Sequence, residues 1–283
     1  MAITVSKESK SEIVYKDPKR AFRKLGTCSQ TLCYLLNREF GNPRVIQERA
    51  SDPLAGGILQ QGYQCGMLWG ASLAVGAEAY RRCADLDEAL GVAIRATQQI
   101  MTSFVHREHT SNCREITHCD FSNKLSFSRY FLSGRFLHCF KLAEQWAPEA
   151  IQAARQGLLS DRPVLPAGVS SCASEVAGRM GASDEEMVMV AGFAGGLGLS
   201  GSGCGALAAA VWMRSLAWCK THPDRSALKN PMAESLLKSF EELTGSRFLC
   251  TEVSGQRFNN LEEHDYFIRN GGCGKVIETL TER

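Results

Sequence analysis

The most constraining feature of this chain is a set of cysteines that occurs twice. Cys33 and Cys65 are separated by 32 residues, and the same interval separates Cys172 from Cys204. Two further cysteines follow each pair at similar spacings, namely Cys113 and Cys139 in the first half and Cys250 and Cys273 in the second. Repetition over so long a period is typical of a duplicated domain and not of a solenoid built from short repeats.

A glycine-rich segment is duplicated as well, at a constant offset of 139 residues. The matching residues are Ala55-Gly56-Gly57 and Ala194-Gly195-Gly196, Gly62 and Gly201, and Cys65-Gly66 and Cys204-Gly205. The register has no gap between Cys33 and Gly66, which predicts that Cys33 corresponds to Cys172. Duplicated domains commonly pack as the subunits of a symmetric dimer do, so we expect the halves to face each other about a pseudo-twofold axis.

The length of 283 residues suits two domains. We predict a basic N-terminal arm over residues 1–20, a first cysteine-containing repeat over 21–155 and a second over 166–283. The segment from Gln156 to Pro166 contains Gly157 and Pro163 and is expected to link the repeats. Each repeat is long enough to bury a hydrophobic core of its own.

Helical patterns dominate both repeats, and the predicted fold class is all-α with two tandem homologous helical domains. Apolar residues recur at helical spacing from Leu86 to His106, and Ser183 and Glu186 have the spacing of a capping box. The other predicted helices are a segment from that box through Ala194, two buried helices over Cys65–Arg82 and Gly205–Lys220, and helices over Met232–Leu243 and Gly272–Leu280.

Composition limits the classes of partner. A net charge of +2 gives no argument for nucleic acid, and no apolar run approaches the roughly 18 residues that cross a bilayer. The basic arm is interpreted as a solvated segment, with docking to an acidic redox partner as the alternative. No secretory signal is recognisable, so a cytoplasmic protein is expected. Twelve cysteines in a reducing compartment favour metal binding or redox chemistry over structural disulfides.

The central cysteines, Cys65 and Cys204, each follow a glycine-rich turn and open a predicted helix. The N–H groups at a helix start stabilise a thiolate, and glycines let backbone amides approach a ligand. Four thiolates from separate helices would bind an iron–sulfur cluster or zinc. The predicted metal ligands are Cys33, Cys65, Cys113, Cys139, Cys172, Cys204, Cys250 and Cys273. The predicted cofactor-binding glycines are Gly57, Gly62, Gly66, Gly196, Gly201 and Gly205.

The second half resembles a known family at these positions. Cys172, the glycine turn ending at Gly196, Cys204-Gly205-Ala206, Cys250 and Cys273 occur in the order for which the C-GCAxxG-C-C family of redox-active proteins is named. The first half is similar from Cys33 to Leu142, although Gln64 stands where the second half has Gly203. Split-Soret cytochromes c contain a similar module that holds an iron–sulfur cluster. The resemblance therefore implies a cluster of the 2Fe–2S or 4Fe–4S type, with a modified site in repeat one as an alternative.

Several weaker signals are given a structural interpretation. Gly196, Gly198 and Gly201 fit the spacing of a dinucleotide-binding turn, but no alternation of strands and helices surrounds them. The histidines near Cys113 are interpreted as helix-end residues; they are His106, His109 and His118. The cysteines outside the repeated set are interpreted as buried apolar residues; they are Cys28, Cys83, Cys119 and Cys219. Glu115 and Glu252 each follow a repeated cysteine by two residues and suggest a helix cap, a buried carboxylate or a salt bridge.

The sequence therefore predicts an iron–sulfur redox protein that exchanges electrons with a partner protein or uses its cluster as a redox cofactor. The first alternative is a thiol–disulfide oxidoreductase or redox sensor, which the absence of a Cys-x-x-Cys pair disfavours. The second alternative is a structural zinc module that presents an interaction surface. Neither nucleic acid nor a membrane is an expected partner, and both an oxidoreductase activity and a homodimer are left open.

Overall fold

The computed structural model describes residues 17–159 and 168–282. Within these residues the chain forms helices and loops, and its extended pairing is limited to two isolated β-bridges. The predicted all-α class is therefore confirmed. Most of the predicted N-terminal arm, residues 1–16, and residues 160–167 of the predicted linker lie outside the described residues.

The helices of the first repeat form one continuous series in chain order. They are α2 (Pro18–Leu25), α3 (Cys28–Glu39), α4 (Val45–Ala50), the 3₁₀ helix η1 (Asp52–Leu54), α5 (Gly66–Arg82), α6 (Leu86–Glu108), α7 (Cys113–Thr117), α8 (Lys124–Leu132) and α9 (Phe136–Leu159). Two expected boundaries shift. Helix α2 starts within the predicted arm because Asp17 caps it, accepting from the Arg20 amide. Helix α9 continues through the first residues of the predicted linker.

The second repeat follows the same order with shorter outer helices. They are α10 (Cys172–Arg179), α11 (Asp184–Ala191), α12 (Gly205–Thr221), α13 (Pro231–Thr244), α14 (Cys250–Ser254), α15 (Leu261–Arg269) and α16 (Gly274–Thr281). The predicted capping box is present at the start of α11, where Ser183 and Glu186 accept from each other's backbone amides. Helix α11 ends at Ala191, before the predicted Ala194, because the glycine turn starts there.

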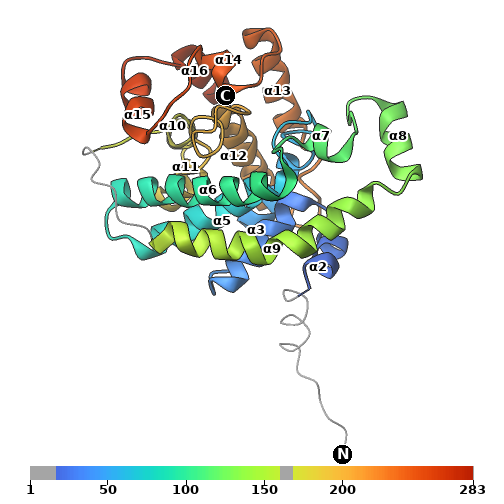
Figure 1. The fold of residues 1–283 in the computed structure, drawn as a ribbon. Coiled ribbons are helices and arrows are strands. Elements are labelled where there is room, and N and C mark those ends of the chain that lie inside the picture. Colours follow the sequence, from blue (N-terminus) through green and yellow to red (C-terminus); the bar gives the residue numbers. More distant parts are fainter. Residues whose placement is uncertain (1–16, 160–167, 283) are drawn as a thin grey trace, which may run out of the picture.

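Reciprocal contacts relate the two repeats by a pseudo-twofold axis. At the offset of 139 residues, α4 corresponds to α11 and α5 to α12. Helix α5 packs against α11 of the other repeat, and α12 packs against α4 in return. A pair of contacts exchanged in this way is the signature of an isologous interface. In Figure 1, helices α3, α5, α6 and α9 of the first repeat lie in the lower part of the molecule, α13–α16 of the second repeat lie at the top, and α7 and α8 lie at the right.

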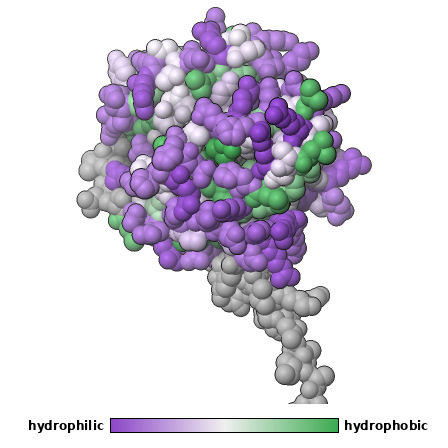
Figure 2. All heavy atoms as spheres, turned by 45° about the vertical axis from the view of Figure 1, so that its right-hand side comes forward, coloured by the Kyte–Doolittle hydropathy of each residue, from purple (hydrophilic) through white to green (hydrophobic). Residues whose placement is uncertain are grey.

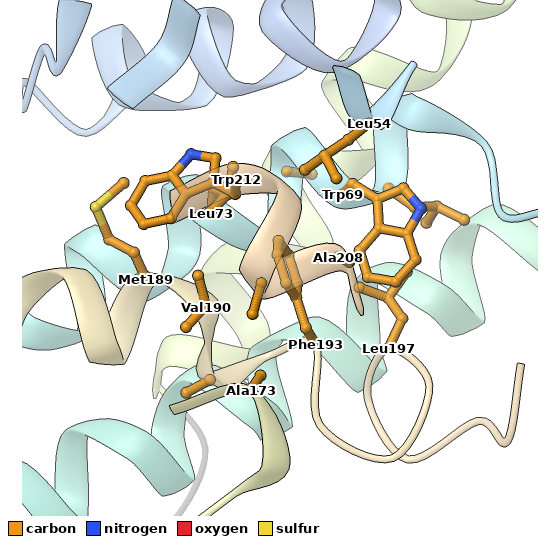
Figure 3. Packing of buried hydrophobic residues seen from close by; sticks show 14 of the residues in the cluster. Leu54, Trp69, Leu73, Ala173, Met189, Val190, Phe193, Leu197, Ala208 and Trp212 are labelled. Atoms are coloured by element: carbon orange, nitrogen blue, oxygen red, sulfur yellow. The ribbon is translucent and has the colours of Figure 1, made fainter. Parts of the chain in front are cut away.

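The two repeats share one hydrophobic core, and buried aromatic residues lie at the seam between them. The rings of Trp69 and Phe193, one from each repeat, meet edge to face with centroids 4.8 Å apart. The indole of Trp212 donates to the carbonyl of Gln47 across the same seam. Figure 3 shows side chains of both repeats at this position. Both tryptophans are fully buried core residues.

Most of the surface in Figure 2 is hydrophilic, with apolar side chains in small groups. The large exposed apolar residues of the first repeat include Leu125, Phe131 and Leu132 on α8 and Leu137 at the start of α9. Among the described helices, none is both long and apolar enough to cross a lipid bilayer.

Candidate functional site

The first cysteine of each site is the first residue of a helix. Cys28 starts α3 and Cys172 starts α10. A hydroxyl side chain caps both helices from the preceding position, that of Thr27 in one repeat and that of Ser171 in the other. Cys28 is therefore the structural counterpart of Cys172.

The glycine turn supports the same equivalence. The amide of Gly56 hydrogen-bonds to the Cys28 thiol, and the amide of Gly195, at the 139-residue offset, hydrogen-bonds to the Cys172 thiol. In each case this bond acts to lower the pKa of the thiol, because a donor stabilises the thiolate. The same backbone group of each repeat thus faces the same cysteine.

The predicted pairing of Cys33 with Cys172 is therefore wrong. Cys33 lies in the second turn of α3, where it is fully buried and accepts from the side-chain amide of Asn37 at 3.7 Å. Burial and then the charge of Glu48 raise the pKa of Cys33, and no other cysteine influences it. The shift arises because α3 has 12 residues and α10 has 8, and because the loop after α3, residues 40–44, is one residue longer than the loop after α10, residues 180–183.

Each glycine turn contains five consecutive residues with positive φ, from Gly56 to Gln60 and from Gly195 to Leu199. A left-handed turn of this length is costly for residues with a side chain, on the order of 1–2 kcal/mol each. The β-branched Ile58, at φ 59°, is the most demanding case. Burial of Ile58 and Leu197 at 0% exposure compensates for this strain. The glycines at the predicted dinucleotide spacing belong to such a turn, which follows helix α11 and not a strand.

The turn leads directly to the central cysteine, which pairs with the third cysteine of its repeat. In repeat two the amide of Cys204 donates to Phe248 at 2.8 Å, and the amide of Cys250 donates to Ser202 at 2.5 Å. The β-bridge between Gly203 and Leu249 lies between these two bonds.

Repeat one has the same pairing. The amide of Cys65 donates to Ser111 at 2.7 Å, and that of Cys113 donates to Tyr63 at 2.6 Å. Central and third cysteines therefore lie on adjacent segments in both halves.

The four cysteines of repeat two form one buried group. Burial raises the pKa of Cys172 well above its ordinary value, and the thiols of Cys250, Cys204 and Cys273 raise it further. Burial first, and then the neighbouring thiols, raise the pKa of Cys250 to about 12, and burial and Cys204 raise that of Cys273 to about 12. The predicted cysteines of this repeat are thus brought together, and all four are neutral thiols in the absence of a positive charge.

Repeat one also brings its cysteines together, but with a different balance. A hydrogen bond from the Cys65 thiol is the main cause of a lowered pKa at Cys28, and burial opposes it. The pKa of Cys113 is raised by burial and by the charges of Cys28, Cys139 and Cys119. The group is therefore Cys28, Cys65, Cys113 and Cys139, with Cys119 as a fifth thiol at its edge.

The fourth position is occupied differently in the two repeats. Cys139 lies inside α9, and its thiol is within hydrogen-bonding distance of the Tyr130 hydroxyl, at 3.4 Å. Cys273 precedes α16 in the left-handed conformation, with φ 56°. Burial raises the pKa of Cys139 to about 11, with the Tyr130 hydroxyl acting in the opposite direction.

The predicted cofactor-binding glycines make room for the protein's own backbone and side chains. A Cβ atom on Gly57 or Gly196 would lie 2.3 Å from Tyr63 N or 2.6 Å from Ser202 N. On Gly62, Gly201 and Gly205 it would meet Arg114, Thr251 and Phe193, respectively. Contact with a site cysteine is found at Gly66, where a Cβ would lie 2.6 Å from Cys28 Sγ, and at Gly196, where it would lie 2.9 Å from Cys250 Cβ.

Sequence reasoning missed several groups near the thiols. Thr117 and Ser254 each stand four residues after the third cysteine of their repeat, and their hydroxyls act to lower the pKa of Cys113 and Cys250. The repeated Cys-x-x-x-Ser/Thr spacing was the available signal. For Cys28 the signal was a hydroxyl residue directly before it, as in Ser171-Cys172. Tyr130 had no repeated counterpart that would have indicated it.

The remaining candidates lie away from the thiol groups or cap helices. His109 and His118 are the C-terminal caps of α6 and α7. Glu252 accepts from the Leu249 amide at the start of α14 and is a capping group, whereas Glu115 accepts from the side chains of Thr110 and Asn112. Cys83 and Cys219 lie at or near the far ends of α5 and α12.

Among the described residues no two cysteines form a disulfide. Within residues 17–159 and 168–282, no three His, Cys, Asp or Glu side chains are grouped so that they would hold one metal ion. The thiols of each site are thus near enough to influence one another's pKa, yet they are not gathered around a single point.

Comparison with known proteins places the chain in one family. The sequence model of the family described as putative redox-active protein (C_GCAxxG_C_C) matches twice, over residues 27–150 and 169–283. The two matches coincide with the two repeats. The first match starts at Thr27, directly before Cys28, in agreement with the register that the structure shows. No curated protein and no solved structure matches the chain.

Proposed function

Because the chain belongs to the C_GCAxxG_C_C family, whose description assigns a redox role, we propose that it is an iron–sulfur cluster-binding redox protein. The proposed ligands in repeat two are Cys172, Cys204, Cys250 and Cys273. In repeat one they are Cys28, Cys65, Cys113 and Cys139. Bound in this way, a cluster would supply one-electron redox chemistry.

The observation that carries this proposal is the convergence of four thiols, three buried and that of Cys273 partly buried, from four separate segments of repeat two. Two of them start helices α10 and α14, and the other two directly precede α12 and α16. Four thiolates are the usual ligand set of a 2Fe–2S or 4Fe–4S cluster. Because each thiolate would repel its neighbours in a buried environment, the set is stable as thiolates when a positively charged group lies among them.

The glycine turns offer backbone amides to the thiols, and such donors would support a negatively charged inorganic group. At Gly66 and Gly196 the missing side chain leaves the cysteine in direct contact with the glycine turn, whose amides point at sulfur in both repeats. Backbone N–H groups directed at sulfur are a common way for a protein to stabilise the negative charge of a cluster. These residues would hold and shield the group, and the helix starts would offset its charge.

The spread of the thiols favours a cluster over a single zinc ion. Tetrahedral zinc–thiolate bonds of about 2.3 Å bring the four sulfur atoms to within about 3.8 Å of one another. A cluster places several iron and sulfide atoms between its ligands, so its cysteines lie further apart. The thiols of repeat two interact without being grouped around one point.

Anaerobic purification followed by iron, sulfide and zinc analysis tests the proposal. We expect iron and acid-labile sulfide in equal amounts, visible charge-transfer absorption, and loss of about half of both when the four cysteines of repeat two are replaced by Ser. The matched control replaces four cysteines outside the two proposed sets, Cys33, Cys83, Cys119 and Cys219, and is expected to keep its iron. A colourless protein with zinc, or with no metal, would contradict the proposal.

Thiol–disulfide chemistry is a second candidate function for repeat one, because the Cys28 thiol is hydrogen-bonded to the Cys65 thiol. The pKa of Cys28 is lowered, whereas its counterpart Cys172 has a raised pKa. As the thiolate is the nucleophile, Cys28 is expected to react with iodoacetamide at a lower pH than Cys172 in the metal-free protein. Equal pH profiles for the two cysteines, measured by peptide mass spectrometry, would remove this candidate.

A further inference from the structure

One side chain of repeat one reaches into the cysteine turn of repeat two. Gln64 is fully buried and its Oε1 accepts a hydrogen bond from the Gly203 amide at 3.0 Å. At the offset of 139 residues, Gly203 is the counterpart of Gln64 itself, so this contact lies at the pseudo-twofold axis. Gln64 directly precedes Cys65, and Gly203 directly precedes Cys204. The hydrogen bond therefore joins the two residues that directly precede the central cysteines of the two repeats.

This position explains why the repeats differ here. A Cβ atom on Gly203 would lie 2.5 Å from Gln64 Oε1, so the axis has room for one long side chain and not for two. Gln64 fills that space from the first repeat. The glycine at 203 leaves its amide accessible to a partner from the other half of the molecule.

The side-chain amide of Gln64 has one donor group that no contact within the described residues uses. The Gln64 carbonyl of the main chain accepts from the Trp69 indole at 3.2 Å, and Oε1 is occupied by Gly203. Its Nε2, which is bonded to the same carbon as Oε1, is buried and has no hydrogen-bond partner among the described residues. A buried N–H₂ group without an acceptor is destabilising, and a bound acceptor would remove that penalty.

We propose that Gln64 is a positioning residue for the sulfur-containing group of repeat two, fixing the Gly203–Cys204 peptide through Oε1 and donating from Nε2 to a sulfur of that group. This inference rests on the proposed function, and it makes the second site a product of both repeats. Sulfide and thiolate sulfurs are acceptors whose hydrogen bonds raise the reduction potential of a cluster, because donors stabilise the more negative reduced state.

The first test uses the metal-free full-length chain. Gln64→Met removes both hydrogen-bonding groups at nearly constant volume, and Gln64→Asn keeps the amide but is too short by one methylene to reach Gly203. Both variants are expected to raise the rate at which iodoacetamide modifies Cys204 by roughly tenfold, the effect of losing one buried hydrogen bond. Cys219, near the other end of α12, is the internal reference.

The matched control is Gln61→Met. Gln61 lies in the same turn of the same repeat, but its Nε2 donates to Leu59 within that turn and not to the other repeat. The modification rate of Cys204 is expected to be unchanged in this variant. An equal increase in both Met variants would show a general loosening of the turn and would overturn the assignment of Gln64.

The second test measures the reduction potential of repeat two in anaerobically purified protein. Cys113→Ser and Cys139→Ser are combined as a background in which repeat one lacks two of its proposed ligands. In that background Gln64→Met is expected to lower the potential by about 59 mV, a tenfold change in a one-electron equilibrium, with Gln61→Met unchanged.

Three outcomes separate the possible failures. An unchanged modification rate at Cys204 overturns the contact across the axis. A changed rate with an unchanged potential shows that Gln64 supports the fold alone, and it overturns the proposed role toward the bound group. Absence of iron and sulfide from the unmodified protein sinks the proposed function and, with it, the role of Nε2, while the effect on Cys204 reactivity would still stand.

Discussion

The two cysteine sites share a backbone frame but differ in the chemistry of their thiols. In both, a capped helix start, a left-handed glycine turn and a two-segment bridge place three cysteines in the same way. In repeat two the pKa of every site thiol is raised, with burial as the main cause. In repeat one the pKa of Cys28 is lowered by a hydrogen bond from the Cys65 thiol. Duplication thus fixes where three of the sulfur atoms of each site lie, and local neighbours decide how each one ionises.

The fourth cysteine shows how the surrounding helices create this difference. Helix α9 has 24 residues and packs along α6 and α2, whereas α16 has 8 residues and packs against the ends of α10, α12 and α13. The longer helix carries Cys139 on its second turn and brings it under Tyr130 of α8. In repeat two the cysteine stands before the helix, beside Gly272 and Gly274. The side of each site away from the axis is therefore the variable one.

The largest expected effect concerns the register of repeat one. Replacing Cys28 by Ser removes a proposed ligand and is expected to release about half of the bound iron and sulfide, because one of two sites is lost. Cys33→Ser leaves the site intact and is expected to keep its iron, at a cost of about 1–3 kcal/mol in unfolding free energy from a buried hydroxyl. Iron analysis and urea unfolding of the two variants measure both effects. Release of iron by Cys33→Ser but not by Cys28→Ser would restore the register that the sequence suggested.

The sequence could give the duplication, the helical class and the second site, because these depend on local patterns. The glycine-rich turns before apolar helices and the Ser183–Glu186 capping box can be recognised from residues that are adjacent in the sequence. It could not give Cys28, because α3 is four residues longer than α10 and the loop after it is one residue longer, so the register shifts by five residues before α4. The interval of 32 residues between Cys33 and Cys65 matches that between Cys172 and Cys204 by coincidence, and the positions of Cys28 and Cys172 at helix starts reveal the true correspondence.

The next effect compares the glycines that follow the central cysteines. A Cβ on Gly205 would lie 1.9 Å from the Phe193 carbonyl oxygen, which is backbone and cannot rotate away. On Gly66 the nearest atom is Cys28 Sγ at 2.6 Å, a side chain that can rotate, and the nearest backbone atom is Ala55 Cα at 2.8 Å, a milder clash than that of Gly205. Gly205→Ala is therefore expected to destabilise the protein by about 3 kcal/mol, and Gly66→Ala by about 1–2 kcal/mol with loss of the repeat-one metal. Gly274→Ala, with open space around it, is the control. Equal urea midpoints for the three variants would contradict this ranking.

A smaller expected difference between the repeats is in the pH dependence of the free energy of unfolding. His264 of α15 is buried, and its counterpart in α8 is Phe127. Burial lowers the pKa of His264 to about 4, against the weaker effect of Asp265. The unfolded chain, with an ordinary pKa near 6.5, binds the proton first as the pH falls, so stability is full above about pH 6.5 and is lost toward pH 4.

Between pH 7 and pH 5 this group is expected to cost the folded protein about 2 kcal/mol. His264→Phe, which installs the residue of the other repeat, should remove that part of the pH dependence. Urea unfolding at the two pH values provides the measurement. A pH dependence that is the same in the variant and the unmodified protein would show that His264 is protonated without cost in the fold.

Prediction of the site from sequence fails most clearly for contacts that have no counterpart in the other repeat. Gln64 meets its own equivalent at the axis, and an alignment of the halves shows it as a mismatch, although the structure makes it a bond between them. Tyr130 likewise has no match in α15, where Phe267 stands at the same step of the helix. Contacts between elements that are distant in the chain, and not local propensity, determine both.

The smallest expected effect isolates that tyrosine. The Tyr130 hydroxyl acts to lower the pKa of Cys139, which burial raises to about 11, whereas Cys273 has no such donor and its pKa is about 12. Tyr130→Phe is therefore expected to raise the pKa of Cys139 toward that of Cys273, by the equivalent of about 1 kcal/mol for one hydrogen bond. The pH dependence of iodoacetamide modification at Cys139 in metal-free protein measures the change, with Cys273 as the reference in the same sample. If the profile of Cys139 does not move, the difference between the outer cysteines comes from burial alone, and the hydroxyl does not tune this thiol.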